Sequence, residues 1–354
     1  MNIGLIIQGP ILSGGFTGKT HGSGRTRASK NSLVNFDSTS SINQNITIAQ
    51  DYFSEIVVST WENQDTEKIK GKCKIIKSID PTPNPPSTRK PIEDFPDFNK
   101  INKIRQFYSV FKGLNHLEKM GIEHAIKIRT DQTLDLKLLF NDYSFFLESS
   151  NKKFMIPFLT DDEPWSIPDF YIGGSISDFN DLVMLMINEK FEFHRNVHRD
   201  LFFKGAFINS KFFKENCLSE FFVFKDYQNK NLSKILDISR DRIWSPASKD
   251  LYNSLIWRGE PISISQKPRK IFANDKTATK LDITDQMNID WNLFLRTTTG
   301  SGSLLRFNLN YVSFKVRKLY LDSRSNFSSI LDKLSNRFLF KVFDFSRFRN
   351  SRIK

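Results

Sequence analysis

The sequence predicts an α/β protein with a buried, mostly parallel central sheet, followed by a helical, basic C-terminal extension. Three observations lead to this prediction. Short and almost wholly apolar segments recur along the first half of the chain, as strands covered on both faces do. The connections between them are helical or long, as parallel strands require. Lys and Arg are concentrated in residues 301–354, where apolar residues recur at helical spacing.

The first predicted strand is residues 3–12, a continuous apolar run. Residues 13–45 are rich in Gly, Ser, Thr and Asn and are expected to be loop. Residues 80–91 (DPTPNPPSTRKP) contain too many prolines for regular structure. Further strands are expected at the remaining short apolar runs, residues 55–60 (EIVVST), 73–78 (CKIIKS), 124–129 (HAIKIR) and 153–160 (KFMIPFLT).

One helix is predicted clearly, over residues 99–120. Gly121 follows where a C-terminal cap belongs, and Arg105 falls outside the apolar stripe. A packed helical layer is also expected in the Phe-dense residues 191–228. The apolar residues of the first helix recur three or four apart, at Ile101, Ile104, Tyr108, Phe111, Leu114 and Leu117.

The composition indicates a globular protein of a reducing compartment. A hydrophobic fraction of 39% in 354 residues is enough for one large domain or two smaller ones. Apolar runs are too short for a transmembrane helix, and the N-terminus lacks the basic and small-residue features of a signal peptide. Cys73 and Cys217 have no disulfide or metal-site spacing. We therefore expect a cytoplasmic protein.

The positive charge lies mainly in the C-terminal segment. Residues 301–354 contain twelve Lys or Arg and three Asp, a local net charge of +9 out of the total of +13. This distribution argues against a nucleic-acid groove across the protein body. It predicts binding of the segment to an anionic membrane surface, at the inner face of the cytoplasmic membrane. Two alternatives are a terminal helix docked on the core and a nucleic-acid-binding tail. The apolar stripe consists of Phe327, Ile330, Leu331, Leu334 and Phe338.

A phosphate-binding loop is only partly present. Gly18-Lys19-Thr20 fits the second half of the P-loop pattern, but Ser13 stands where the first Gly belongs. The residues that follow have no apolar period that could bury a helix face. We expect a flexible basic loop that can touch a phosphorylated ligand, and the alternative is a phosphotransferase or NTPase. The basic residues of the loop are Lys19, Arg25, Arg27 and Lys30.

Polar residues follow each predicted strand. Carboxyl ends of parallel strands meet at one edge of a sheet, where functional groups gather. Four of the five ends bring a carboxylate there, a pattern typical of a site for a divalent cation, a sugar or both. The five ends are Gln8-Gly9-Pro10, Ser59-Thr60-Trp61-Glu62, Asp80-Pro81, Arg129-Thr130-Asp131-Gln132 and Asp161-Asp162-Glu163.

The ordered fragments GLIIQGPI, EIVVSTWE, SIDP, IRQFYSVFKGL, AIKIRTDQ and PDFYIGG resemble the WavE family of lipopolysaccharide-synthesis proteins over residues 3–185. The resemblance implies a glycosyltransferase with a GT-A-like, nucleotide-sugar-binding fold. It would act on a lipopolysaccharide core, O-antigen or capsule acceptor, free or lipid-linked. A GT-A-like domain would span residues 1–300, with a nucleotide-binding half to about residue 150 and an acceptor half beyond it, and residues 301–354 would form the basic amphipathic segment. The long loop after the first strand and the Pro-rich insertion depart from the family pattern.

The resemblance also implies roles for the donor side. GT-A enzymes usually end the fourth strand with Asp-x-Asp, whose last Asp holds a metal on the diphosphate. Here Asp131 would hold Mg²⁺ or Mn²⁺. Arg129 replaces the first Asp and could instead pair with phosphate directly, so metal-independent action stays open. Asp131 as a local helix cap is the alternative.

The other donor-side residues have local alternatives as well. Gln8, Gly9 and Pro10 would lie against the nucleotide, or form only a tight turn. Ser59, Thr60 and Trp61 suit a sugar or uracil-like ring, or cap the sheet. Asp80 would bind ribose hydroxyls or open a turn, and Arg105 would hold the pyrophosphate or lie on a solvated helix face.

A carboxylate is needed as general base if the transfer inverts the anomeric carbon. Asp169 is the preferred base, beside a tight turn at Gly173-Gly174. Asp161, Asp162 and Glu163 are rivals, and a retaining reaction stays open. His194 and His198 lie four apart, but no third ligand supports a zinc site, whereas His198 near an acceptor stays open.

Overall fold

The chain divides into two compact units. The computed structural model describes part of the chain, and all of the described residues belong to the first unit. The first unit comprises residues 1–215 and 228–289, and the second comprises residues 216–227 and 290–354. The loop that contains Gly18-Lys19-Thr20, the carboxylates Asp161 and Asp162, His194 and the basic segment 301–354 lie outside the described residues. The described residues are 2–15, 34–81, 98–160, 166–187, 197–205, 208, 239–262 and 270–273.

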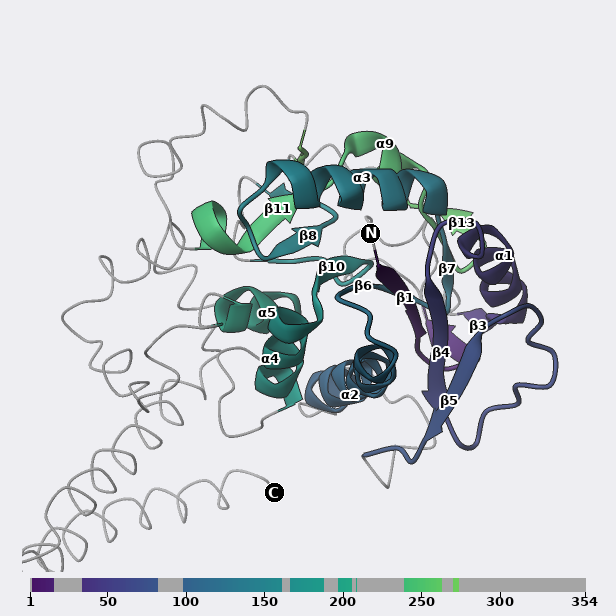
Figure 1. The fold of residues 1–354 in the computed structure, drawn as a ribbon. Helices are drawn as coiled ribbons and strands as arrows, with labels where there is room; N and C mark the ends of the chain where they lie inside the picture. Colours follow the sequence, from purple (N-terminus) through teal and green to yellow (C-terminus); the bar gives the residue numbers. More distant parts are fainter. Residues whose placement is uncertain are drawn as a thin grey trace, which may run out of the picture. The chain divides into compact units, whose positions relative to one another are not determined.

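A seven-stranded sheet forms the centre of the first unit, in the order β11-β8-β10-β6-β1-β4-β5 (Figure 1). All neighbouring strands pair in parallel except β10, which is antiparallel to both β6 and β8. This confirms the α/β class with a mostly parallel sheet. The strands are β1 (Ile3–Gln8), β4 (Glu55–Trp61), β5 (Lys74–Ser78), β6 (His124–Arg129), β8 (Phe154–Ile156), β10 (Ile172–Ser175) and β11 (Trp244–Pro246).

Helices cover both faces of this sheet. On one face lie α2 (Phe98–Lys119), α4 (Ile176–Ile187) and α5 (Val197–Gly205) (Figure 1). On the other lie α1 (Thr39–Ala49), α3 (Leu136–Ser149) and α9 (Lys249–Asn253). A five-residue π-helical turn, η4 (Ser239–Ile243), precedes β11. None of the helices in the described part of the chain is long and apolar enough to cross a bilayer.

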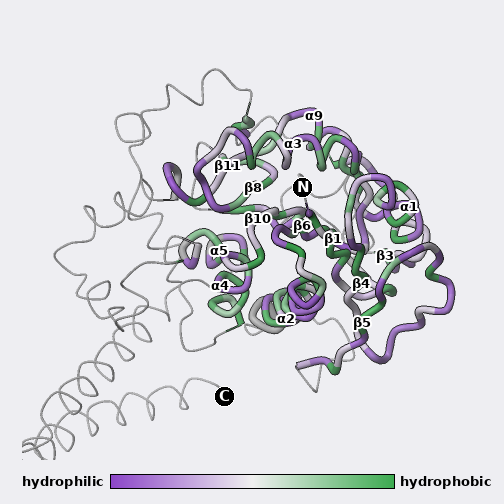
Figure 2. The backbone as a smooth tube through the Cα atoms, in the orientation of Figure 1, coloured by the Kyte–Doolittle hydropathy of each residue, from purple (hydrophilic) through white to green (hydrophobic). Residues whose placement is uncertain are grey.

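Strand β1 is buried along its whole length because both of its faces are covered. Ile3, Leu5 and Ile7 belong to the core cluster that α1 and α3 also enter. On the opposite face Ile6 lies against Gly113 of α2, where the absence of a side chain lets the helix approach closely. Figure 2 shows the resulting apolar centre, with hydrophobic residues gathered on β1, β4 and β6.

The clearest predictions from local pattern are confirmed. Strands β4, β5 and β6 occupy the segments expected at residues 55–60, 73–78 and 124–129, and α2 occupies the expected helix. Gly121 ends α2 with φ of 71°. Its N–H donates to the Glu118 carbonyl at 3.0 Å, and the N–H of Ile122 donates to the Leu117 carbonyl at 3.0 Å. This is a Schellman cap, which requires a residue with positive φ.

Two expected strands are each interrupted. The run at residues 3–12 ends at Gln8, because Gly9 has φ of 132° and turns the chain. The chain then forms β2 (Leu12–Gly15), which pairs with β3 (Val34–Asp37). The run at residues 153–160 divides into β8 and β9 (Leu159–Thr160) around Pro157, which has no N–H for a sheet. Strand β9 pairs with β14 (Lys270–Ile271).

The expectation of a loop over residues 13–45 is wrong for its described part, which contains β2, β3 and the start of α1. Helix α1 was hidden by its polar composition, TSSINQNITIA. Ile42, Ile46 and Ala49 nevertheless recur on one side and are fully buried. The side chain of Asn45 is also buried, and its Nδ2 donates to the Gln132 carbonyl at 2.8 Å. Tertiary packing therefore stabilises this helix where local propensity does not indicate it.

The expected tight turn at Gly173-Gly174 is also wrong. Both glycines lie within β10, in the middle of the sheet. A Cβ on Gly173 would lie 2.6 Å from the Tyr143 ring, and one on Gly174 would lie 2.5 Å from the Phe154 ring. Both glycines are therefore explained by close packing of aromatic rings on the strand.

Candidate functional site

The strand register brings three polar sequence motifs to one edge of the sheet. Gln8, at the end of β1, lies opposite Ser59 of β4 on one side and opposite Arg129 of β6 on the other. This arrangement is the one expected from the carboxyl ends of parallel strands. The candidate site begins at this edge.

The Gln8-Gly9-Pro10 turn packs directly on the Arg-Thr-Asp motif, although 120 residues separate them. The N–H of Thr130 donates to the Gln8 carbonyl at 3.0 Å, and Thr130 Oγ1 donates to the Pro10 carbonyl at 2.8 Å. A Cβ on Gly9 would lie 2.8 Å from Thr130 Oγ1, in addition to the strain of its positive φ. Gly9 is therefore needed for the contact between the two motifs.

Arg129 and Asp131 form a two-point ion pair at the end of β6. Arg129 Nε donates to Asp131 Oδ1 at 2.9 Å, and Nη2 donates to Oδ2 at 3.1 Å. A third donor of the same guanidinium group, Nη1, donates to Oδ2 of Asp169 at 3.0 Å. Arg129 thus joins Asp131, the predicted metal ligand, to Asp169, the predicted base, and the two carboxylates together raise its pKa despite burial.

A hairpin supplies two further partners of Asp131 that sequence reasoning missed. Strands β12 (Ile256–Trp257) and β13 (Glu260–Pro261) are joined by Arg258 and Gly259, whose φ angles are 51° and 79°. Positive φ at both central residues is typical of a two-residue hairpin turn. Strand β12 pairs with β7 (Gln132–Thr133), which directly follows Asp131. The Trp-Arg-Gly-Glu sequence could have indicated this turn, but its partner strand could not be read from it.

The hairpin closes around the Asp131 carboxylate. Trp257 Nε1 donates to Asp131 Oδ2 at 3.1 Å, and Arg258 Nε donates to the same oxygen at 2.9 Å. The N–H of Arg258 also donates to the Asp131 carbonyl at 2.9 Å. Burial alone would raise the pKa of Asp131, but Arg129, Arg258 and the indole lower it to about 2. Asp131 is therefore an ionised carboxylate that holds two guanidinium groups.

Asp169 lies just before β10, on the other side of Arg129. Burial would raise its pKa, but the charges of Arg129, His198 and Lys127 hold it well below the usual range. The prediction that Asp169 takes a proton from the acceptor stays a prediction, and ion pairing makes it a weak proton acceptor.

Lys127 is a fully buried lysine beneath this cluster. It lies in the middle of β6, and its Nζ donates to the Asp169 carbonyl. Burial lowers its pKa, and the charge of Arg129 adds to that effect, whereas Asp169 and Asp131 oppose it; the result is about 7. The group can therefore change its charge near neutral pH.

Other predicted donor-side residues pair with one another or with α2. Arg105 of α2 and Asp80, after β5, form an ion pair with Nη2 2.5 Å from Oδ2. Ser59 Oγ donates to the Ser109 carbonyl of α2 at 2.7 Å. Thr60 and Trp61 are buried. Contact of these residues with a nucleotide or sugar stays a prediction.

The donor set at Asp131 does not fit a divalent cation as it is arranged. Both carboxylate oxygens accept hydrogen bonds from cationic or N–H donors, which a metal ion would have to displace. Among the described residues, no group of three or more His, Cys, Asp or Glu could hold a metal ion. Asp161 and Asp162 lie outside that part of the chain.

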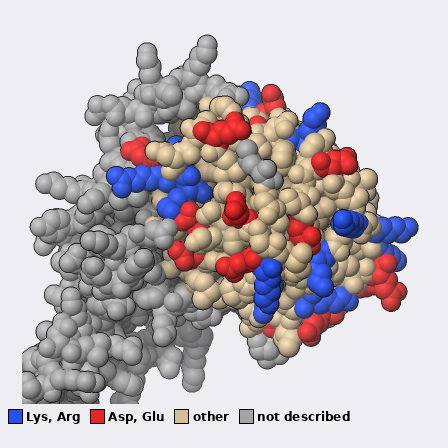
Figure 3. Space-filling view, viewed as in Figure 1, with Lys and Arg blue, Asp and Glu red and all other residues tan. Residues whose placement is uncertain are grey.

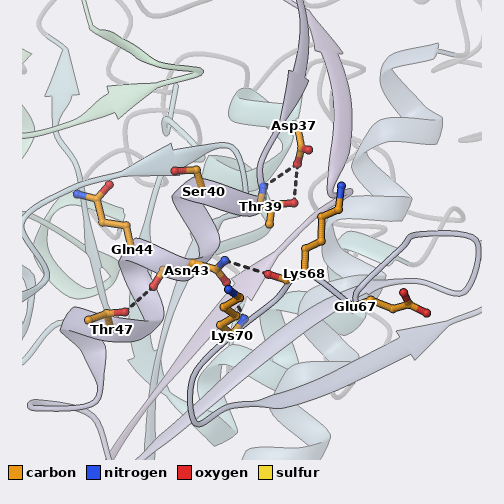
Figure 4. A pocket seen from close by; sticks show the side chains of 9 residues that line it. All are labelled: Asp37, Thr39, Ser40, Asn43, Gln44, Thr47, Glu67, Lys68 and Lys70. Atoms are coloured by element: carbon orange, nitrogen blue, oxygen red, sulfur yellow. Dashed lines mark hydrogen bonds between the residues drawn. The ribbon is translucent and has the colours of Figure 1, made fainter.

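A separate hollow of about 850 Å³ lies beside α1 (Figure 4). Its hydrogen bonds join its own walls, since Asn43 Nδ2 donates to the Lys68 carbonyl and Asn43 Oδ1 accepts from the Lys70 N–H. No predicted site residue lines it. The lining residues are Asp37, Thr39, Ser40, Asn43, Gln44, Thr47, Glu67, Lys68 and Lys70.

On the face in Figure 3, acidic and basic side chains are interspersed over the described residues.

Three solved structures are distantly similar to this chain. A cytidylyltransferase from Leptospira borgpetersenii is 16% identical with a TM-score of 0.29, and the match covers 52% of this chain and 65% of that one. A 4-diphosphocytidyl-2C-methyl-D-erythritol synthase from Anaerococcus prevotii is 15% identical with a TM-score of 0.29, covering 54% and 78%. HddC from Yersinia pseudotuberculosis is 13% identical with a TM-score of 0.28, covering 51% and 79%. Similarity of this size carries no argument about activity.

A family model matches the part of the chain that builds the sheet edge. Residues 3–160 match the model described as WavE lipopolysaccharide synthesis, which confirms the resemblance over these residues. They include Arg105 and the Gln8, Ser59 and Arg129 motifs, whereas Asp169 and the hairpin lie beyond the match. The protein therefore matches the WavE lipopolysaccharide-synthesis family across residues 3–160.

Proposed function

We propose that this protein is a glycosyltransferase that moves a sugar from a nucleotide-sugar donor to a bacterial surface glycan, namely a lipopolysaccharide core, an O-antigen or a capsule chain. One observation carries the proposal. Two guanidinium groups, Arg129 and Arg258, are held by one carboxylate, Asp131, at the carboxyl edge of a mostly parallel sheet. The family match covers the strands that form this edge.

Arg129 has donors left for a phosphate. Among the described residues, three of its five N–H groups donate to Asp131 and Asp169, so two remain. Its side chain is 22% exposed, so a ligand at the sheet edge can reach it. The planar fork suits phosphate oxygens, and a positive charge placed there stabilises the leaving nucleoside diphosphate as the glycosidic phosphate bond breaks.

Arg258 is held in a strained conformation beside Arg129. A non-glycine residue with φ of 51° is disfavoured by about 1–2 kcal/mol, and two hydrogen bonds to Asp131 maintain it. The Trp257 ring contacts both guanidinium groups, at 5.0 Å from Arg258 and 5.7 Å from Arg129. Strain of this kind is concentrated at functional sites, which supports a binding role for the hairpin.

We assign Asp131 to positioning the two arginines, so that the diphosphate is bound without a metal at this carboxylate. The charges of Arg129 and Arg258 are balanced by Asp131 and Asp169. Lys127 supplies a further positive charge when it is protonated, and an incoming diphosphate would favour that form. The Arg105–Asp80 pair and the Gln8 turn lie at the ends of strands of the same sheet, where we place the nucleoside.

The test is thermal stabilisation of the purified protein by UDP, GDP, CMP, dTDP, ADP and ATP, each with Mn²⁺ and with EDTA. A ligand at 100 times its Kd stabilises the folded state by about 2.7 kcal/mol, which raises Tm by several degrees. We expect one nucleoside diphosphate or CMP to raise Tm equally in EDTA. Arg129→Lys and Arg258→Lys should each lose most of the shift relative to their own ligand-free Tm.

The matched control is Arg242→Lys. Arg242 is exposed and precedes β11, so it lies at the amino ends of the parallel strands, opposite the edge formed by their carboxyl ends. The control variant should keep the full shift. A shift with ATP alone that disappears in Lys19→Ala would support the phosphotransferase alternative and overturn the proposal. A shift that requires Mn²⁺ would overturn the metal-independent part only.

We also propose that residues 301–354 bring the enzyme to a lipid-linked acceptor at an anionic membrane. Their charge of +9 and their apolar stripe support this. Sedimentation with phosphatidylglycerol vesicles should recover the full chain and fail to recover a chain that ends at residue 300. Equal recovery of both chains would refute the membrane role, and recovery on RNA in place of vesicles would support a nucleic-acid-binding tail.

A further inference from the structure

His198 lies beside Asp169 and is fixed by the segment that carries it. The N–H of Ile167 donates to the His198 carbonyl at 3.0 Å, and His198 Nδ1 is 2.9 Å from the Ile167 carbonyl. A carbonyl oxygen only accepts hydrogen bonds, so Nδ1 must carry the hydrogen. In the neutral ring the lone pair is then on Nε2, the nitrogen that points away from this contact.

Asp169 is placed to support a charged imidazole. Its Oδ1 is 3.9 Å from His198 Nδ1, close enough for its charge to stabilise an imidazolium. The carboxylate itself is occupied by Arg129, which makes it a weak base. The hydrogen bond from Nδ1 to the backbone carbonyl fixes the orientation of the ring and leaves Nε2 as the basic nitrogen.

Solvent exposure also favours His198 over Asp169 as the group that meets an acceptor. The His198 side chain is 27% exposed, whereas the Asp169 side chain is 10% exposed. An acceptor hydroxyl that approaches this edge can therefore reach the imidazole more easily than the carboxylate. Helix α5 begins at Val197, so the position of His198 is set by the first turn of a helix rather than by a loop.

We propose that His198 is the general base of the transfer step, that the Ile167 carbonyl orients its ring and that the charge of Asp169 stabilises the imidazolium it becomes. The acceptor oxygen bonds to the anomeric carbon of the donor while its O–H bond breaks and the proton passes to Nε2 of His198. The bond between the anomeric carbon and the phosphate oxygen breaks, and its electron pair leaves with the nucleoside diphosphate beside Arg129. The imidazolium then returns its proton to solvent. The inference rests on the proposed glycosyl transfer, and it implies inversion at the anomeric carbon.

The main variant is His198→Asn, because the Asn amide keeps a donor near Nδ1 for the Ile167 carbonyl and removes the Nε2 acceptor. The assay measures nucleotide released from UDP-glucose, GDP-mannose, dTDP-glucose, ADP-glucose and CMP-N-acetylneuraminic acid, with water as acceptor. We expect kcat to fall by about 10²–10⁴-fold while KM for the donor changes less than twofold. His198→Ala should regain part of its activity with added imidazole.

The control is His116→Asn, since His116 pairs with Glu55 at the amino end of β4, away from the site. It should leave kcat unchanged. If the wild type is active and the kcat of His198→Asn is within threefold of the wild-type kcat, the base assignment is overturned. The proposed glycosyltransferase function would then still stand. A wild type that binds no nucleotide and releases none from any donor would overturn the proposed function, and the base assignment with it.

A second measurement does not depend on activity. Nitrogen-15 NMR of the histidine rings distinguishes the two neutral tautomers, and His198→Asn identifies the signal of His198. We expect the Nδ1–H tautomer. An Nε2–H tautomer would overturn the proposal even in an active enzyme.

Discussion

The buried lysine Lys127 leads to a pH dependence of stability that can be worked out from its surroundings. Its pKa is about 7 in the folded protein and 10.5 in an exposed lysine. The folded state therefore gives up this proton near neutral pH, whereas the unfolded chain keeps it to much higher pH. Because the unfolded state binds more protons between these two values, the contribution of Lys127 to stability rises as pH rises through this window.

The variant that tests this pH dependence is Lys127→Met, which keeps the length of the side chain and removes its charge. Integration of the proton difference between pH 7 and pH 9 gives about 2 kcal/mol for a single group with these two pKa values. The free energy of unfolding of the wild type, minus that of the variant, should therefore increase by about 2 kcal/mol from pH 7 to pH 9. The constant part of the difference, which includes loss of the bond to the Asp169 carbonyl, cancels.

The assay is urea unfolding followed by tryptophan fluorescence at pH 7, 8 and 9. Lys153→Met, which removes a half-buried lysine paired with Asp178, controls for the loss of one positive charge. A difference between wild type and Lys127→Met that changes by less than about 0.5 kcal/mol from pH 7 to pH 9 would contradict a folded pKa near 7 for Lys127. It would mean that Asp169 and Asp131 keep the buried amine charged at all three pH values.

Three further predictions concern packing and strain in the same region. Gly174→Ala should destabilise the fold by about 1–3 kcal/mol, because its Cβ would lie 2.5 Å from the Phe154 ring in the middle of the sheet; an unchanged urea midpoint would contradict this. Arg258→Gly should be about 1 kcal/mol more stable than Arg258→Ala, because only glycine relieves the positive φ, and the reverse order in urea unfolding would exclude strain there. Asp131→Asn should destabilise the protein by about 2–3 kcal/mol near pH 7. This deficit should shrink as pH falls from 4 towards 2, because the folded pKa lies below 3.8, and acid titration of Tm for both proteins tests it.

Local sequence pattern was sufficient for some elements because each carries its own signal. Helix α2 has an apolar period and a terminal Gly121, and strand β6 (HAIKIR) carries the β-branched and apolar residues of a short strand. The sheet edge could also be predicted, since carboxyl ends of parallel strands must meet. Gln8 and Arg129 lie opposite each other as this rule requires.

Local pattern failed where the reason for a residue lies elsewhere in the chain. Helix α1 looks like a polar loop, and its Asn45 makes sense only once Gln132 is beside it. The two glycines of β10 look like a turn until the rings of Tyr143 and Phe154 are placed over them. In each case the deciding contact is between residues far apart in sequence.

The α/β class, the main strands and the edge at which Arg129 and Asp131 lie follow from local sequence pattern, because apolar period and strand direction are local properties. The contacts of these residues follow only from the folded chain. It placed Trp257 and Arg258 on Asp131, Arg129 between two carboxylates, and His198 beside Asp169. Hairpin pairing and helix packing make these contacts between residues that lie on different elements of the chain, so the pattern within any one element does not show them.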